Sequence, residues 1–261
     1  MNAEKITSKD NPKIKEIVKL KSSAKERGLR GLIVVEGYRE LSLALEAKLN
    51  LDSLFFCPEF FKGKPLFKIA SNNLYELTPN IFEKISYREN PDGVLALISL
   101  TPLSLNKIRL SNSPLIIVLE AVEKPGNLGA ILRTADASGV DTVLISDPKT
   151  DIYNPNVIRA SQGTVFTTQV ATGSKDEIQE FLKSSGVSLI ATTPEAEKIY
   201  TEIDYKLPTA ILMGTEDTGL SDAWLKVSDE QVKIPMHGKI DSLNVSVSTA
   251  ILVYEALRQR S

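Results

Sequence analysis

The residues best suited to chemistry lie in three clusters of small and polar side chains in the second half of the chain. They span residues 120–133, 212–221 and 234–246, and each follows an apolar run of the kind that forms a buried strand. Open α/β sheets bind their ligands beyond the carboxyl ends of the strands. The three clusters are therefore the candidates for a ligand site.

The first cluster, EAVEKPGNLGAILR, combines two glycines with Asn127 and Arg133. Gly126 and Gly129 permit a tight turn, and Asn127 is a candidate N-cap for the helix that follows. Arg133 comes six residues after Asn127, less than two turns into that helix and near the place where a phosphate could dock. A capped structural helix with a surface arginine would show the same pattern, so this cluster alone decides nothing.

The second cluster, LMGTEDTGLS, has glycines at 214 and 219 and an acid between them. Gly214 and Gly219 let backbone approach a ligand closely, and Glu216 could face it. A loop with two turn glycines and a solvated acid is an equally good interpretation.

The third cluster, IPMHGKIDSLNVS, leads into an amphipathic segment at 245–258 that predicts a final helix. Several small hydrogen-bonding groups stand at the start of this helix: Ser242, Asn244 and Ser246. The alternative is a polar cap for the helix, with Met236 and Leu243 as ordinary packing residues. His237 is then an exposed loop residue.

The elements that must position these clusters alternate between strands and helices. Strands are expected at 115–120, 142–146, 165–170, 187–192, 209–213 and 231–234. Apolar strands separated by helical segments indicate a largely parallel sheet covered on both faces. The sequence thus predicts an α/β domain over residues 114–261.

The first hundred residues predict a second, smaller α/β domain. Helices are expected at 13–27 and 38–48, and strands at 32–35, 51–56, 66–69, 74–77 and 93–100. The stretch 101–114 contains prolines at both ends, several serines and asparagines, and only weak periodicity, so residues 101–113 are expected to link the two domains. The predicted domains are therefore 1–100 and 114–261.

Composition excludes several classes of protein. The chain has no tract of 18 apolar residues, and its polar beginning lacks the apolar core of a signal peptide. A single cysteine, Cys57, rules out an internal disulfide framework and a cysteine-rich zinc site. A single histidine, His237, removes paired-histidine metal motifs and argues against a histidine triad. We expect a cytoplasmic protein with no protein-built metal centre and no membrane contact.

Positive charge gathers in the first thirty residues, which hold nine lysines and arginines against four acids, a net charge of five. Such a segment attracts phosphates through counterion release. A well-solvated helix explains the same charges equally well.

Taken together and in order, the three clusters closely resemble the motifs of the SpoU–TrmH family of RNA ribose methyltransferases, in the SPOUT class. The resemblance rests on the Asn127-x-Gly129…Arg133 segment, the Gly-x-Glu-x-x-Gly loop at 214–219 and the Ile-Pro-Met-x-Gly…Ser-Leu-Asn-Val-Ser segment at 234–246. It covers residues 115–260. The segments NPKIK at 11–15 and VEG at 35–37 resemble the RNA substrate-binding domain that precedes the catalytic domain in many members directed at ribosomal RNA.

The resemblance implies a trefoil knot in the C-terminal domain, a homodimer and a bent S-adenosylmethionine bound near the subunit interface. The implied cofactor-binding residues are Gly214, Ile234, Met236, Leu243 and Ser246. The implied catalytic residues are Arg133, Asn127, Glu216, Ser242 and Asn244, with Arg133 placed at the ribose hydroxyl and the adjacent phosphate.

The expected function is S-adenosylmethionine-dependent methylation of a ribose 2′-hydroxyl in RNA, with no role for DNA. Ribosomal RNA of the 23S type is preferred over transfer RNA because of the N-terminal resemblance. Three alternatives stay open: a knotted RNA-binding or ribosome-assembly factor without catalysis, an enzyme directed at transfer RNA, and an enzyme that methylates a base. Whether Arg133 acts as a base or as a phosphate clamp also stays open.

Overall fold

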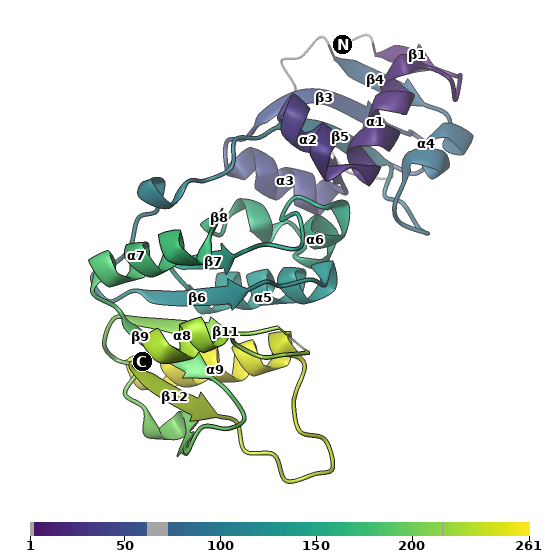
Figure 1. Ribbon diagram of the computed structural model, residues 1–261. Helices are drawn as coiled ribbons and strands as arrows, with labels where there is room; N and C mark the ends of the chain where they lie inside the picture. The colour runs from purple at the N-terminus through teal and green to yellow at the C-terminus, as the bar shows by residue number, and fades with distance from the viewer. Residues whose placement is uncertain (1–2, 62–72, 216) are drawn as a thin grey trace. The chain divides into compact units, whose positions relative to one another are not determined.

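A computed structural model of the chain describes residues 3–61, 73–215 and 217–261, which form two compact units (Figure 1). The first unit contains the residues up to 101 together with 153–167, and the second contains 102–152 and 168–261. The division differs from the domain limits expected from the sequence, because 102–113 pack with the second unit and 153–167 with the first. The strand expected at 66–69 lies outside the described residues.

The first unit is built on a five-stranded mixed sheet with the order β1-β4-β3-β5-β2. Its strands are β1 (Glu4–Ile6), β2 (Leu32–Glu36), β3 (Asn50–Phe56), β4 (Leu74–Leu77) and β5 (Val94–Ser99). Strand β5 runs antiparallel to β2 and β3, and the remaining pairs are parallel. Helices α1 (Pro12–Ser22) and α4 (Pro79–Ile85) bury their apolar faces in one core cluster with residues of this sheet.

The basic segment at 13–27 forms two helices, so the single helix expected there is wrong. Helix α1 ends at Ser22, and α2 (Ala24–Arg30) begins after Ser23. Ser23 has an extended backbone and its hydroxyl accepts a hydrogen bond from the Glu26 amide. Serine side chains bind nearby backbone amides and so favour helix ends over helix interiors, which explains the break.

Residues 153–167 add two short helices to the first unit, one against β2 and the other against α3 (Tyr38–Glu46). They are α6 (Pro155–Ala160) and the 3-10 helix η2 (Thr164–Phe166). The strand expected at 165–170 is therefore wrong at its start, and the strand itself, β8, spans Val170–Gly173. Val165 is buried, but in a helical turn that begins at Gly163. An apolar run reports burial and does not distinguish a strand from a helical turn.

The second unit is built on a seven-stranded sheet with the order β10-β12-β9-β11-β6-β7-β8, in which every pair is parallel. Its other strands are β6 (Leu115–Glu120), β7 (Thr142–Ser146), β9 (Ser188–Thr192), β10 (Lys198–Ile199), β11 (Thr209–Met213) and β12 (Glu230–Lys233). The parallel α/β architecture predicted from the apolar runs is confirmed. The trefoil knot stays a prediction.

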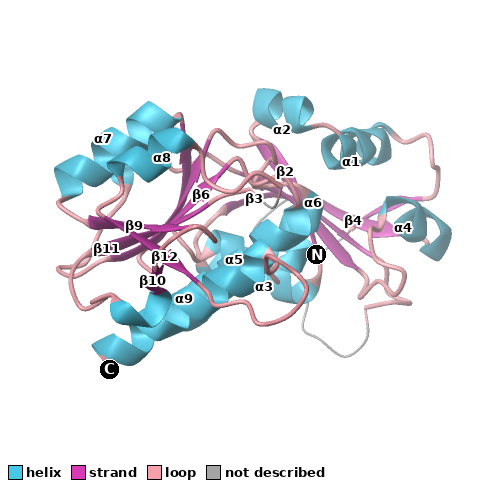
Figure 2. Ribbon diagram, turned by 60° about the horizontal axis from the view of Figure 1, so that its bottom comes forward, coloured by secondary structure: helices cyan, strands magenta, loops and turns pink. Residues whose placement is uncertain are grey.

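Helices cover both faces of this sheet, as its apolar strands require. Helices α7 (Lys175–Ser185) and α8 (Asp222–Val227) pack on one face, and α5 (Pro125–Ser138) and α9 (Val245–Arg260) lie together on the other (Figure 2). Two 3-10 helices, η1 (Leu105–Lys107) and η3 (Tyr200–Glu202), lie in the connections. None of the helices in the described part of the chain is long and apolar enough to cross a membrane.

Arg260, in the last turn of α9, ties that helix to two connections of the second unit. Its guanidinium donates to the carbonyl oxygens of Ser113, Pro114, Tyr205 and Leu207 over 2.7–3.2 Å. Hydrogen bonds from a charged donor are stronger than neutral ones, so Arg260→Ala is expected to lower the free energy of unfolding by about 2 kcal/mol. Urea denaturation measures this loss. Arg258→Ala is the control, because the exposed Arg258 pairs only with Glu255 among the described residues, and an equal loss in both variants would contradict the assignment.

Candidate functional site

A cavity of about 720 Å³ lies at the carboxyl ends of β9, β11 and β12. The segments that follow these strands line it: 192–195 after β9, 213–220 (except 216) after β11, and Ile234 and Met236 after β12. Residues 241–243 and the first turn of α9 complete the wall. This edge of the sheet is where open α/β folds bind ligands, and residues of the second and third clusters lie there.

The structure brings four of the five predicted cofactor-binding residues to this cavity: Gly214, Ile234, Met236 and Leu243. Ser242, predicted as catalytic, lines it as well. Ser246 is not among the lining residues, and its hydroxyl donates to Oδ1 of Asn244 over 2.6 Å at the start of α9. The roles of all these residues stay predictions.

The loop after β11 closes on itself. The amide of Thr215 donates to the Gly219 carbonyl over 3.1 Å, and the Gly219 amide donates back over 3.2 Å. A Cβ atom built on Gly214 would overlap the backbone of Gly219 and Leu220. Glycine is therefore required at 214 by the packing of the loop itself, in addition to the close approach of a ligand expected from the sequence. Glu216 lies outside the described residues.

Helix α5 begins earlier than expected. Its N-cap is Lys124 and its first residue is Pro125, a residue whose fixed φ suits that position. The expected N-cap, Asn127, is therefore the third residue of the helix, and Gly126 and Gly129 lie within it and make no tight turn. Arg133 is the ninth residue, more than two turns into α5. Its side chain is exposed and has no hydrogen-bond or ion-pair partner among the described residues.

Asn127 and Asn244 join the first cluster to the third. The Asn244 side-chain amide donates to Oδ1 of Asn127 over 3.1 Å, so the starts of α5 and α9 meet. Asn244 is also the N-cap of α9, because its Oδ1 accepts from the Ser246 amide over 3.0 Å. The polar cap expected at the start of the last helix is confirmed. Arg133, by contrast, is not among the residues that line the cavity.

Three acidic residues in the cavity wall escaped the sequence analysis: Glu195, Asp217 and Asp241. The Thr193 hydroxyl and the backbone amide of Glu195 itself donate to the Glu195 carboxylate, and these bonds lower its pKa. The cavity wall therefore carries negative charge at neutral pH. The position of residues 193–195 directly after β9 was the one signal that could have found Glu195.

The model of the SpoU rRNA methylase family matches residues 114–254, a range that holds every residue of the cavity wall. The chain belongs to the SpoU rRNA methylase family. The family predicted from the three motifs is confirmed. A second model, described as an MRM3-like substrate binding domain, matches residues 11–96 of this SpoU protein.

Relatives match this SpoU protein along nearly its whole length. An uncharacterized tRNA/rRNA methyltransferase of Synechocystis is 33% identical and covers 98% of this chain and 94% of its own. The 23S rRNA (guanosine(2553)-2′-O)-methyltransferase RlmP of Bacillus subtilis is 29% identical, with 95% and 97% covered. A solved RNA 2′-O ribose methyltransferase is 42% identical, with a TM-score of 0.86 over 98% of this chain and 99% of that one. An AdoMet-bound rRNA methyltransferase from Sinorhizobium meliloti is 28% identical, with a TM-score of 0.89 and 98% of each chain covered.

Proposed function

We propose that this SpoU family protein is an S-adenosylmethionine-dependent RNA ribose 2′-O-methyltransferase that acts on ribosomal RNA. The observation that carries the proposal is the cavity beyond β9, β11 and β12, whose wall contains residues of the second and third family motifs. Curated relatives named as 23S rRNA 2′-O-methyltransferases favour ribosomal over transfer RNA as the substrate. Because it would act on ribosomal RNA, we place the protein in the cytoplasm.

The residues of the cavity fit S-adenosylmethionine, which supplies a methyl group already activated by the positive sulfonium. The volume of about 720 Å³ lies within the usual range of small-molecule sites. The cavity wall offers apolar side chains that could pack against the adenine: Met213, Leu225, Ile234, Met236 and Leu243. The carboxylates of Glu195, Asp217 and Asp241 complement the positive charges of the cofactor.

Arg133 is the group that we assign to the RNA. Its guanidinium is exposed, and a guanidinium suits a phosphate clamp better than a general base because arginine holds its proton tightly. A fixed positive charge beside the ribose stabilises the alkoxide that forms as the 2′-hydroxyl loses its proton. Asn127 and Asn244 hold the start of α5 against α9 and so orient the helix that carries Arg133. We assign Ser242 and Glu216 to the catalytic residues as well.

The test is transfer of labelled methyl from S-adenosylmethionine to unmodified ribosomal and transfer RNA, followed by nucleoside digestion and mass analysis. A 2′-O-methylnucleoside from ribosomal RNA is the expected product. A product from transfer RNA alone would change the substrate, and a methylated base would overturn the assignment of Arg133. Cofactor binding without transfer to either RNA would favour an assembly factor that does no chemistry.

A homodimer formed through α9 is part of this proposal. Val247 and Tyr254 are 47% and 49% exposed, and with the half-buried Ile251 they follow the 4,3 spacing of one helix face. Burying such an apolar stripe favours association, so Tyr254→Glu is expected to convert a dimer into a monomer in sedimentation velocity runs. Val227→Glu, an equally exposed apolar position on α8, is the control and should leave the dimer intact. A monomeric parent protein would contradict the dimer outright.

A further inference from the structure

An exposed tyrosine of the first unit lies close to two cations. The side chain of Tyr87 is 44% exposed and follows helix α4. The Lys21 ammonium, from α1, lies 5.6 Å from the centroid of its ring. The guanidinium carbon of Arg159, from α6, lies 5.2 Å from the same centroid. Both distances fall within the range of cation–π attraction, so the three side chains form one group, here called the Tyr87 platform.

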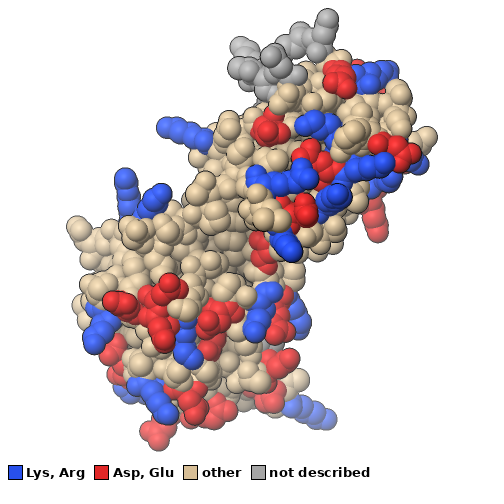
Figure 3. Space-filling model, turned by 45° about the horizontal axis from the view of Figure 1, so that its top comes forward, with Lys and Arg blue, Asp and Glu red and all other residues tan. Residues whose placement is uncertain are grey.

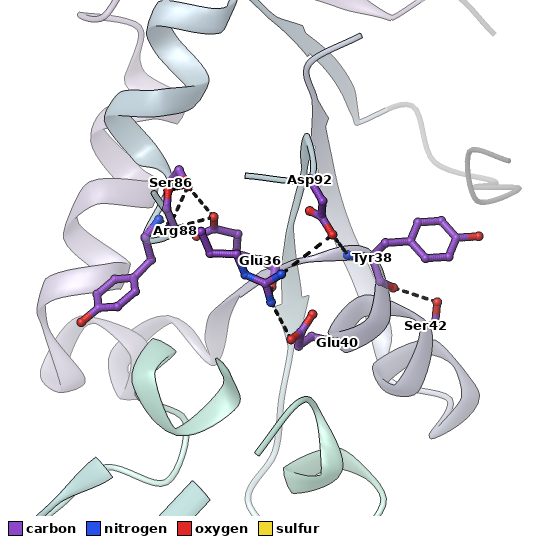
Figure 4. Close-up of polar contacts among 8 residues, drawn as sticks. Glu36, Tyr38, Glu40, Ser42, Ser86, Arg88 and Asp92 are labelled. Atoms are coloured by element: carbon purple, nitrogen blue, oxygen red, sulfur yellow. Dashed lines mark hydrogen bonds and ion pairs between the residues drawn. The ribbon is translucent and has the colours of Figure 1, made fainter. Parts of the chain in front are cut away.

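The backbone beneath the Tyr87 platform is held in one conformation by Glu36. The Glu36 carboxylate accepts from the Tyr87 amide over 2.6 Å, from the Ser86 hydroxyl over 2.5 Å and from the Arg88 amide over 3.4 Å (Figure 4). Arg88 in turn donates to the buried Glu40 over 2.5 Å. The backbone that carries the Tyr87 ring is thereby held before any ligand arrives, which reduces the entropy lost on binding. Within the VEG segment at 35–37, Glu36 makes these contacts.

The two cations of the platform differ in what they can offer. Lys21 donates to the Ile85 carbonyl, and burial lowers its pKa, with Glu36 acting in the opposite direction. The Arg159 side chain is exposed and has no hydrogen-bond or ion-pair partner among the described residues. Its N–H donors are therefore available beside an exposed aromatic ring.

Many other cations of the same unit are neutralised by acids. Lys13 pairs with Glu16, Lys15 with Asp10, and Arg30 with both Glu16 and Glu26. Figure 3 shows this mixture, with blue and red side chains interleaved over the face of the first unit. The pairing fixes Lys13, Lys15 and Arg30 on their acids. Arg159 differs from these residues because no described acid pairs with it and it lies beside an exposed aromatic ring.

We propose that the Tyr87 platform binds an unpaired nucleotide of the RNA substrate. The base stacks on the Tyr87 ring or on the Arg159 guanidinium plane, and the Arg159 donors hold the adjoining phosphate. Aromatic and guanidinium planes bind bases that are free of a helix, because paired bases hide their faces in the stack. This inference rests on the proposed RNA substrate and adds to it the class of RNA structure recognised: a loop, a bulge or a single-stranded end.

The test compares two labelled probes, a single-stranded RNA of about 12 nucleotides and an RNA duplex of about 16 base pairs, by fluorescence anisotropy. Tyr87→Ala is expected to weaken binding of the single strand about 10-fold and to leave the duplex unchanged. Tyr87→Phe keeps the ring and should bind as the parent protein does. Arg159→Gln should weaken binding of the single-stranded RNA. It should also reduce the slope of log affinity against log salt concentration by about 0.7, as the loss of one phosphate contact does. Arg30→Gln, whose side chain is paired with acids, should change neither affinity nor slope.

Unchanged affinity of Tyr87→Ala for the single strand would overturn the inference, and so would an equal loss on the duplex. Melting temperature and S-adenosylmethionine affinity are measured on each variant, and both should match those of the parent protein. A fall in either would show that Tyr87 supports the fold. A failure of this inference can be distinguished from a failure of the proposed function. Tyr87-dependent RNA binding without methyl transfer would remove the enzymatic proposal alone, and methyl transfer without Tyr87-dependent binding would remove this inference alone.

Discussion

Arg133→Ala is expected to slow methyl transfer by about 10²- to 10³-fold, the usual cost of removing one group that stabilises developing negative charge. The affinity for S-adenosylmethionine should stay within about twofold of the parent value, because Arg133 does not line the cavity. Single-turnover rates with saturating RNA measure the first effect, and calorimetry measures the second. Such a split would assign Arg133 to the chemical step and away from cofactor binding.

Two further variants separate the roles that Arg133 could have. Arg109→Ala removes another exposed arginine of the second unit and should leave the rate unchanged. Arg133→Lys keeps a positive charge but loses the planar fork, so a phosphate clamp should recover part of the lost rate. A lysine variant as slow as the alanine variant would count against a purely electrostatic clamp. An alanine variant as fast as the parent would remove Arg133 from the mechanism.

Gly214→Ala is expected to abolish measurable cofactor binding and to destabilise the second unit by about 3 kcal/mol. The added Cβ would overlap the backbone of Gly219 and Leu220, and backbone cannot move aside as a flexible side chain can. The loop that lines the cavity would have to open to relieve the overlap. Calorimetry with S-adenosylmethionine and urea denaturation measure the two effects.

Two other glycines serve as matched controls for Gly214. An added Cβ at Gly219 meets nothing within 4 Å, but its φ of +68° makes alanine cost about 1 kcal/mol, so Gly219→Ala should bind the cofactor with modestly lower stability. Gly238→Ala meets open space without a positive φ and should behave as the parent protein does. If all three variants lost binding equally, close packing at Gly214 could not be the cause.

The sheet of the second unit was predictable because its strands are continuous apolar runs. Strands β6, β7 and β11 begin and end where the sequence analysis placed them, since both faces of each strand are buried and a proline or an aspartate (Pro114, Asp141 or Pro208) directly precedes each run. Strands β1 and β10 have three and two residues, too short for a pattern to form, and were missed. The strand predicted to begin at Val165 was wrong, because that buried residue packs in a helical turn.

The site was predictable in its location more than in its detail. Glycines and small polar residues after β11 and β12 identified the cavity edge, because that is where parallel strands present their loops. The start of α5 was misjudged because Pro125, which favours the first helical position, outweighs Asn127 as an end signal. Asp241 could not be found, since a carboxylate in a loop looks the same in sequence whether it faces a cavity or bulk water, and only its position after β9 distinguished Glu195.

The path of the chain through residues 153–167 limits how the two halves of this protein can be exchanged during evolution or engineering. The chain passes from one unit to the other three times, after 101, 152 and 167. A recombination event that replaced only the N-terminal hundred residues would leave α6 and η2 facing a foreign partner, with Val157, Ile158 and Val165 stripped of their packing. A replacement for the first unit must therefore arrive together with a matching version of this internal segment. A cut in the sequence after residue 101 therefore does not separate the two folded units, because the first unit also contains residues 153–167.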